Sequence, residues 1–339
     1  MPRTSPRSST SAGLVIAVIA AFSFGMSGAF IKPLLEAGWS PAAAVTVRAL
    51  VGGIVLTPAA VILLRGRWSA LWRARWRVLL MALIGVSGTQ LVYFAALERI
   101  PVSTAILFEY MAPVLLVAFA WATSRRMPQV VVLIGSVIAV AGLVLVVGPA
   151  GGAHLDPLGL AFGALAMVGC AVYYVVAAAP SDDLPPVALA AAGLVIGGIA
   201  LGIVGLTGLV PFTISTAPTT VLGGIVPWWV PMLIVGVVAT AVAYTANITA
   251  SEMLGTRLAS FAGLLEVVAA TLYAWLLLGE DLTALQFVGG ALILGGIGFV
   301  RSAREPAGLE PAAAGPVAAG PIAAGPTVDP TPTAPLTLA

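Results

Sequence analysis

The sequence predicts an all-α integral membrane protein in which ten transmembrane helices form two inverted five-helix repeats, with both termini in the cytoplasm. Three observations lead to this fold class. Ten apolar segments follow one another between residues 13 and 301, and a helix needs about 20 apolar residues to cross a bilayer. Basic residues gather on alternate connections between these segments, and the two halves of the chain resemble each other.

The composition excludes a soluble fold and several kinds of chemistry. The chain is 60% hydrophobic and only 8% charged, with a mean hydropathy of +1.10, whereas soluble domains carry about 25% charged residues. The net charge of +2 does not indicate a nucleic-acid partner. Cys170 is the only cysteine, so a disulfide within the chain is excluded, and we expect this residue to serve in packing. With one histidine, His154, and no phosphate-binding loop, we expect no metal and no other cofactor.

The apolar segments define the domain organisation. They are 13–31, 42–64, 78–97, 102–122, 129–148, 158–178, 186–206, 230–250, 257–278 and 284–301. Residues 13–148 form the first repeat and residues 158–301 the second, with an outer linker at 149–157 and a cytoplasmic tail at 1–12. Residues 302–339 are rich in Pro, Ala and Gly and lack a periodic apolar face, so we expect a disordered cytoplasmic tail.

The orientation follows from the lysines and arginines. On one side of the predicted bilayer lie Arg3, Arg7, Arg65, Arg67, Arg73, Arg75, Arg77, Arg125, Arg126, Arg257, Arg301 and Arg304. The other side has only Lys32 and Arg99. The positive-inside rule therefore puts both termini in the cytoplasm. An even number of spans requires both termini on one side as well, and we expect a multi-pass protein of the cell membrane.

The connection at 65–77, RGRWSALWRARWR, has a pattern of its own. Trp68, Trp72 and Trp76 recur every four residues, which is one face of a helix, and five arginines surround them. The pattern is typical of a short helix in the cytoplasmic membrane interface, stabilised by aromatic burial and by anionic lipid. The alternative is a basic loop that sets topology and in which the tryptophans are incidental.

An internal repeat relates the two halves. A shift of 154 residues superimposes the third to fifth segments on the eighth to tenth without a gap. The aligned pairs of less common residues are Glu98 with Glu252, Trp121 with Trp275, Gly135 with Gly289 and Gly142 with Gly296. Because each repeat has five spans, the second enters the membrane from the opposite side. Such inverted repeats underlie many secondary transporters, whose halves exchange conformations to open a cavity to either side.

Two stretches carry a more specific pattern: AALERIPVSTAILFEYMAPVLLVAFAW at 95–121, and ASEMLGTRLASFAGLLEVVAATLYAWLLLGED at 250–281, which leads into LQFVGGALILGGIGFV at 285–300. They resemble the EamA family of the drug/metabolite transporter superfamily. Arg48, in VTVRALVGG, matches an arginine common in the second span of that family. The resemblance covers residues 13–301 in two copies. It implies a ten-helix carrier of small metabolites, often amino acids or related compounds.

Three charged residues lie within the predicted spans: Arg48, Glu109 and Glu266. An ionised group in hydrocarbon costs several kcal/mol unless it is paired or hydrated, so each is a candidate for a functional site. Arg48 and Glu109 both lie about 10 Å below the outer surface. They can therefore form an ion pair, either as a structural link between two helices or as an outer gate. Glu266 lies near the midplane without an opposite charge at its depth. It is a candidate for proton coupling or for binding a substrate ammonium, and a protonated carboxyl bonded to a neighbouring helix is the alternative.

Uncharged polar residues also lie near mid-membrane. They are Gln90 and Tyr93 in the third span, Tyr173 and Tyr174 in the sixth, and Tyr244 and Asn247 in the eighth. A cavity lined by such side chains suits a zwitterionic or partly apolar molecule. The alternative for each residue is a hydrogen bond between two helices.

These observations favour a secondary transporter of small metabolites, most simply an exporter that works by alternating access, coupled to protons or to exchange. Its expected partners are the small-molecule substrate and the lipid bilayer. Two other classes stay open: an intramembrane enzyme that modifies lipid, and a membrane scaffold or sensor that transports nothing. The enzyme would need a dense cluster of Asp, His or Arg at one surface, which the sequence lacks. Substrate identity and oligomeric state, a homodimer included, stay open.

Overall fold

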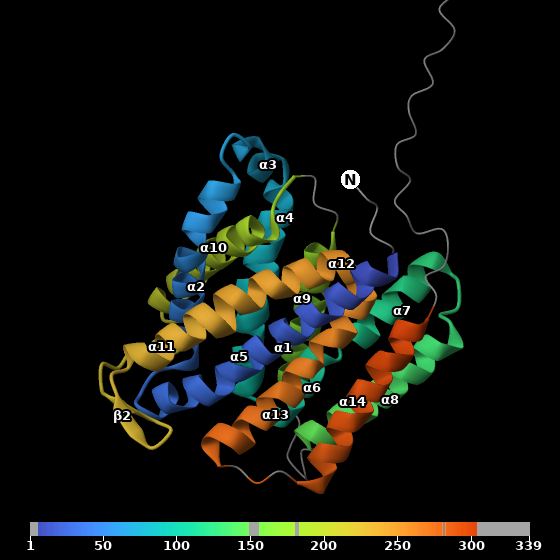
Figure 1. The fold of residues 1–339 in the computed structure, drawn as a ribbon. Helices are drawn as coiled ribbons and strands as arrows, with labels where there is room; N and C mark the ends of the chain where they lie inside the picture. Colours follow the sequence, from blue (N-terminus) through green and yellow to red (C-terminus); the bar gives the residue numbers. More distant parts are fainter. Residues whose placement is uncertain (1–5, 149–155, 180–182, 280, 282, 304–339) are drawn as a thin grey trace, which may run out of the picture. The chain divides into compact units, whose positions relative to one another are not determined.

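The described part of the protein consists of helices and one short β-hairpin (Figure 1). The computed structural model describes residues 6–148, 156–179, 183–279, 281 and 283–303. The predicted disordered tail from residue 304 onward lies outside the described residues, and so does most of the predicted outer linker. The first helix already begins at Pro6, within the predicted N-terminal tail.

The helices follow the predicted segments, with breaks inside several of them. The elements of the first half are α1 (Pro6–Glu36), α2 (Pro41–Leu63), α3 (Trp68–Arg73), α4 (Arg75–Leu80), the π-helix η1 (Met81–Gly88), α5 (Thr89–Leu97), α6 (Val102–Tyr110), α7 (Ala112–Ser124) and α8 (Val130–Val147). Those of the second half are α9 (Pro157–Ala178), α10 (Pro186–Leu206), β1 (Thr219–Val221), β2 (Gly224–Val226), α11 (Trp229–Gly236), the π-helix η2 (Val237–Val242), α12 (Ala243–Gly263), α13 (Leu265–Leu278) and α14 (Ala284–Ser302).

Within the described part of the chain, eight helices are long and apolar enough to cross a membrane. Helices α6 and α7, bent by 42° at Met111, make a ninth candidate if they form one broken span. The end of α12 and the 14-residue α13 cover the remaining predicted segment. Gly255, with φ +75°, interrupts α12 and separates this segment from the preceding one. Glycine adopts this left-handed backbone without the steric cost that a side chain would bring.

The breaks occupy equivalent places in the two halves. The 154-residue shift places η2 on the second part of η1, since Val242 aligns with Gly88. The break at Met111 in the fourth segment falls within one residue of the break at Leu264 in the ninth. π-Helical turns and broken helices leave backbone groups to be satisfied by neighbours, and they concentrate at functional sites.

Helices from the two halves pack in reciprocal pairs. Helix α1 packs against α12 and α13, and α9, its counterpart in the second half, packs against η1, α5 and α6. Helix α2 packs against α10, and α8 lies along α14 (Figure 1). The pairs α2–α10 and α8–α14 join equivalent segments, and the contacts of α1 and of α9 correspond to each other when the halves are exchanged, as a two-fold relation between the halves requires.

Glycines make the contact between α8 and α14 close. A Cβ atom on Gly142 would lie 2.5 Å from the carbonyl oxygen of Gly289, and one on Gly135 would lie 2.9 Å from that of Gly296. Gly135 is the repeat equivalent of Gly289, and Gly142 of Gly296. The repeat therefore relates the contact of Gly142 with Gly289 to the contact of Gly135 with Gly296, with the two partners exchanged. Small residues of this kind let helix backbones approach in a membrane, where lipid offers no hydrophobic drive for association.

Candidate functional site: a polar cavity between the repeats

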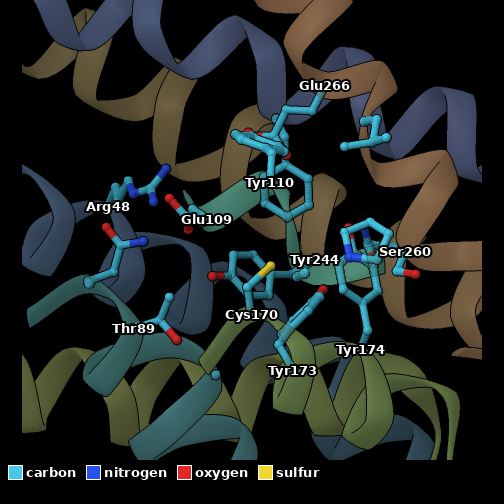
Figure 2. Close-up of a pocket in the computed structure, with 17 residues that line it drawn as sticks. Arg48, Thr89, Glu109, Tyr110, Cys170, Tyr173, Tyr174, Tyr244, Ser260 and Glu266 are labelled. Carbon is cyan, nitrogen blue, oxygen red and sulfur yellow. The ribbon is translucent and has the colours of Figure 1, made fainter. Parts of the chain in front are cut away.

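A polar cavity with a volume of about 110 Å³ lies among helices of both repeats (Figure 2). The first half supplies α1, α2, η1, α5, α6 and α7 to its wall, and the second half supplies α9, α12 and α13. A pocket with convergent polar groups is the arrangement by which proteins bind small molecules. This cavity has room for several water molecules or for a small polar ligand.

The cavity brings together candidate residues from six predicted spans. Eight of the nine candidate residues line it: Arg48, Gln90, Glu109, Tyr173, Tyr174, Tyr244, Asn247 and Glu266. Tyr93 is the exception. It is half-buried outside the cavity wall and packs against a small apolar cluster with Ala96, Ile100 and Ala105 at its centre. Tyr93 and Asn247 are equivalent under the 154-residue shift, but only Asn247 lines the cavity.

Arg48 and Glu109 both point into the cavity (Figure 2). Among the described residues, however, the predicted ion pair is not formed, because no salt bridge within 4.0 Å joins them. Arg48 Nη1 instead donates a hydrogen bond of 3.0 Å to Ser27 Oγ on α1. The guanidinium is thus anchored by a neutral hydroxyl, in the wall of the cavity that Glu109 and Glu266 also line.

Each of the two carboxylates lies beside a helix break. Glu109 is near the end of α6, two residues before the break at Met111, and Glu266 is in the first turn of α13, two residues after the break at Leu264. The N-terminus of a helix favours negative charge because its N–H dipoles are unsatisfied. Tyr110 lies next to Glu266 in the cavity wall (Figure 2). The cavity thus holds two carboxyl groups and one guanidinium.

Aromatic rings form another part of the cavity wall. Tyr173 makes edge-to-face contacts with Tyr174 at 5.3 Å and with Tyr244 at 5.9 Å between ring centroids. Phe24 of α1 contacts Tyr244 in the same manner at 5.1 Å. The Tyr173 hydroxyl is buried and has no hydrogen-bond partner among the described residues. Such a hydroxyl is available to a bound ligand or to water.

Several lining residues were not predicted. Thr89, Tyr110, Cys170 and Ser260 belong to the wall. Tyr110 directly follows Glu109, and this adjacency is the one sequence signal that points to it. Cys170, expected to serve in packing, is half-buried and faces the cavity between the tyrosines (Figure 2). In the described ranges no three His, Cys, Asp or Glu side chains group together as metal ligands would.

The fold and the cavity together define a class of protein. Two similar sets of helices, related by reciprocal packing and enclosing a polar cavity within apolar spans, make up a membrane transporter. The chain belongs to the EamA-like transporter family, whose sequence model matches residues 11–148 and again residues 157–302. The double match confirms the two repeats and the family resemblance of the sequence.

Similar proteins agree with this assignment. An uncharacterized transporter of Archaeoglobus fulgidus is 27% identical over 205 residues, which are 60% of this chain and 69% of the relative. The uncharacterized inner membrane transporter YicL of Salmonella typhimurium is 24% identical over 300 residues, 85% of this chain and 95% of the relative. A protein of known crystal structure, 20% identical, has the same fold, with a TM-score of 0.68 over 85% of this chain and 96% of its own.

Proposed function

We propose that the protein is a secondary transporter that exports small metabolites, amino acids or related compounds, by alternating access, and that it is not an enzyme. The observation that carries the proposal is the cavity itself. Both repeats line it, and Arg48, Glu109 and Glu266 converge there from three different spans. Charged groups inside a membrane are retained where they bind substrate or ions. The expected partners are the substrate and the surrounding bilayer.

The transport model includes ten spans with both termini in the cytoplasm. The ten are the eight long helices, the broken pair α6–α7, and the segment that the end of α12 after Gly255 forms together with α13. Contacts between connections support the grouping of loops by side. Arg73 pairs with Asp183 at 3.5 Å, and Arg99 pairs with Asp156 at 3.3 Å. Each pair joins two connections that the arginine pattern assigns to the same face.

The charges of the cavity favour coupling to a cation. One guanidinium balances one carboxylate, so with both carboxyl groups ionised the cavity keeps one negative charge. An unbalanced charge in a low-dielectric site is costly and attracts a counter-charge. A proton on Glu266, or the ammonium group of a substrate, supplies this positive counter-charge. If the two compete for the same carboxyl, substrate leaves in one direction as protons enter in the other.

Uptake into reconstituted vesicles tests the proposal. The full chain is placed in proteoliposomes, and everted membrane vesicles give the direction of flux. A panel of labelled amino acids and related metabolites is presented with and without an imposed pH gradient. Saturable, gradient-dependent flux that Glu266→Gln abolishes supports a proton-coupled exporter. The matched control is Glu98→Gln, an exposed carboxylate outside the cavity.

Other outcomes count against particular parts of the proposal. Flux that is unchanged in Glu266→Gln across a range of pH contradicts a coupling role for this carboxyl. Flux that ignores the gradient but depends on substrate inside the vesicle indicates exchange. No flux of any compound in the panel contradicts the proposed substrate class and favours the scaffold.

A further inference from the structure

We propose that helices α3 and α4 form a docking surface for the headgroups of anionic phospholipids. We call this surface the arginine–tryptophan surface; it consists of Arg65, Arg67, Trp68, Trp72, Arg75 and Trp76. Transport by the cavity does not use these residues, and the proposal is independent of what the protein carries. It rests on how the segment is held, on which groups it exposes and on which charges are already paired.

The inner face of the segment fixes its position on the helix bundle. Leu64, Ala70 and Val78 are buried, with 3%, 0% and 5% of their surfaces exposed. Leu64 and Val78 belong to a core cluster against which Leu71 and Ala74 also pack. The segment is therefore a packed part of the fold, and its opposite face has a defined direction.

The outer face exposes three large aromatic rings. Trp68, Trp72 and Trp76 are 53%, 73% and 66% exposed. The guanidinium of Arg75 lies over two of these rings, 5.4 Å from the centroid of Trp72 and 5.8 Å from that of Trp76. Three exposed indoles in a row are unfavourable in water and favourable at the level of the lipid headgroups. The surface thus combines aromatic groups with a positive charge held among them.

Two of the five arginines in this segment have carboxylate partners, and the positive charges of the other three are available to a ligand. Arg73 and Arg77 have carboxylate partners, Asp183 and Glu252. Among the described residues, no carboxylate lies within 4.0 Å of Arg65, Arg67 or Arg75. Arg67 and Arg75 each donate one hydrogen bond to a backbone carbonyl, and their other N–H groups have no partner within the described ranges. A guanidinium fork matches a phosphate geometrically, and anionic lipid supplies phosphates at this level.

The position of the surface in the chain selects lipid among anionic partners. It joins the end of α2 to the start of the third span, so it lies where two apolar helices end. Helix α4 runs directly into η1, whose Gly85 belongs to the cavity wall. A headgroup bound on α3 and α4 therefore holds the cytoplasmic end of a cavity-lining segment in the proposed orientation.

Native mass spectrometry of the purified full chain tests the proposal with phosphatidylglycerol and phosphatidylcholine as probes. The test variant combines Arg65→Gln, Arg67→Gln and Arg75→Gln. The matched control combines Arg125→Gln, Arg126→Gln and Arg301→Gln, which removes three exposed arginines whose guanidinium groups, among the described residues, lie over no tryptophan ring. A guanidinium in contact with the bound headgroup contributes about fivefold in affinity, so loss of all three should weaken phosphatidylglycerol binding about 100-fold. The control arginines lie outside this surface and do not contact that headgroup, so the control should change binding by about twofold or less.

Two results would overturn the proposal: equal losses in the test variant and in the control, or equal binding of the two lipids by the wild type. A second measurement uses brominated phosphatidylglycerol, which quenches tryptophan fluorescence on contact. Replacing the three tryptophans of the surface with Phe should lower the quenching, with the remainder coming from Trp121, Trp229 and Trp275, which are also about half exposed. Trp39→Phe serves as a buried control. Quenching that stays at the wild-type level in the triple variant would contradict the assignment of the surface. Thermal unfolding in lipid-free detergent checks that every variant is folded.

Discussion

The guanidinium of Arg77 lies 3.0 Å from the carboxylate of Glu252, and this ion pair joins the start of the third segment to the end of the eighth. Arg77 also donates to two backbone carbonyls at the end of α9, 2.9 Å to Val176 and 3.2 Å to Ala177. One side chain of the first repeat therefore ties together two segments of the second. Both charged side chains are largely buried, with 12% and 20% of their surfaces exposed.

Arg77→Gln should lower the free energy of unfolding by about 1.5–3 kcal/mol, because it leaves Glu252 half-buried without its charged donor. Arg73→Gln is the matched control, since its pair with Asp183 is more than half exposed. Exposed pairs contribute about 0–1 kcal/mol. Unfolding in mild detergent, followed by circular dichroism, compares the two variants. Equal losses of unfolding free energy in the two variants would show that the Arg77–Glu252 pair stabilises the protein no more than an exposed pair does.

Replacing Arg48 with Ala should reduce transport at least about tenfold, because two carboxyl groups would then face the cavity without a fixed positive charge. Ser27→Ala should have a smaller effect, about twofold, since it removes only the hydroxyl that anchors the guanidinium. Initial rates in proteoliposomes measure both. A larger loss of transport in Ser27→Ala than in the Arg48 variant would mean that the Ser27 hydroxyl contributes more to transport than the charge of Arg48.

Gly142→Ala should destabilise the protein by about 1–3 kcal/mol through overpacking, since the new Cβ would lie 2.5 Å from the carbonyl oxygen of Gly289. Gly298→Ala on the partner helix α14 meets nothing within 4 Å. This control should be neutral or stabilising by up to about 1 kcal/mol, because alanine favours the helix. Thermal unfolding curves separate the two. A neutral Gly142→Ala would contradict the close packing of α8 and α14.

Tyr173→Phe should raise the KM for substrate several-fold while leaving stability almost unchanged, because the buried hydroxyl has no partner among the described residues. Tyr93→Phe is the control outside the cavity and should leave KM unchanged. Saturation curves for uptake measure both variants. A large loss of stability in Tyr173→Phe would indicate that the hydroxyl is bonded within the fold.

The unique cysteine allows a test of access to the cavity. Cys170 should react with a small, water-soluble methanethiosulfonate reagent, and a transported substrate should slow the reaction about threefold or more, since both occupy the same cavity. Mass spectrometry follows the modification, and Cys170→Ser provides the unreactive control. A reaction rate that substrate does not change would place the substrate outside this cavity.

The candidate site was predictable in part. Charged and polar residues within apolar segments stand out in a sequence, and eight of them meet in the cavity. Arg48 and Glu109, which the depth argument puts at one level of the membrane, both line the cavity, but that argument did not predict that Ser27 Oγ would accept a hydrogen bond from the guanidinium. Depth along a helix does not specify the rotation of its side chains. For the same reason Tyr93 was assigned to the cavity but packs beside it.

The sequence by itself determined the membrane class, the helical segments, the two repeats and the family. These properties depend on local composition and on periodicity, which the bilayer imposes on every span. Only the tertiary structure decided which side chains share a cavity, where the helices break and which arginines lack carboxylate partners. Those relations join residues far apart in the chain, such as Arg77 and Glu252, and they depend on how helices rotate and cross. Close packing at Gly142 and Gly289 determines part of that rotation.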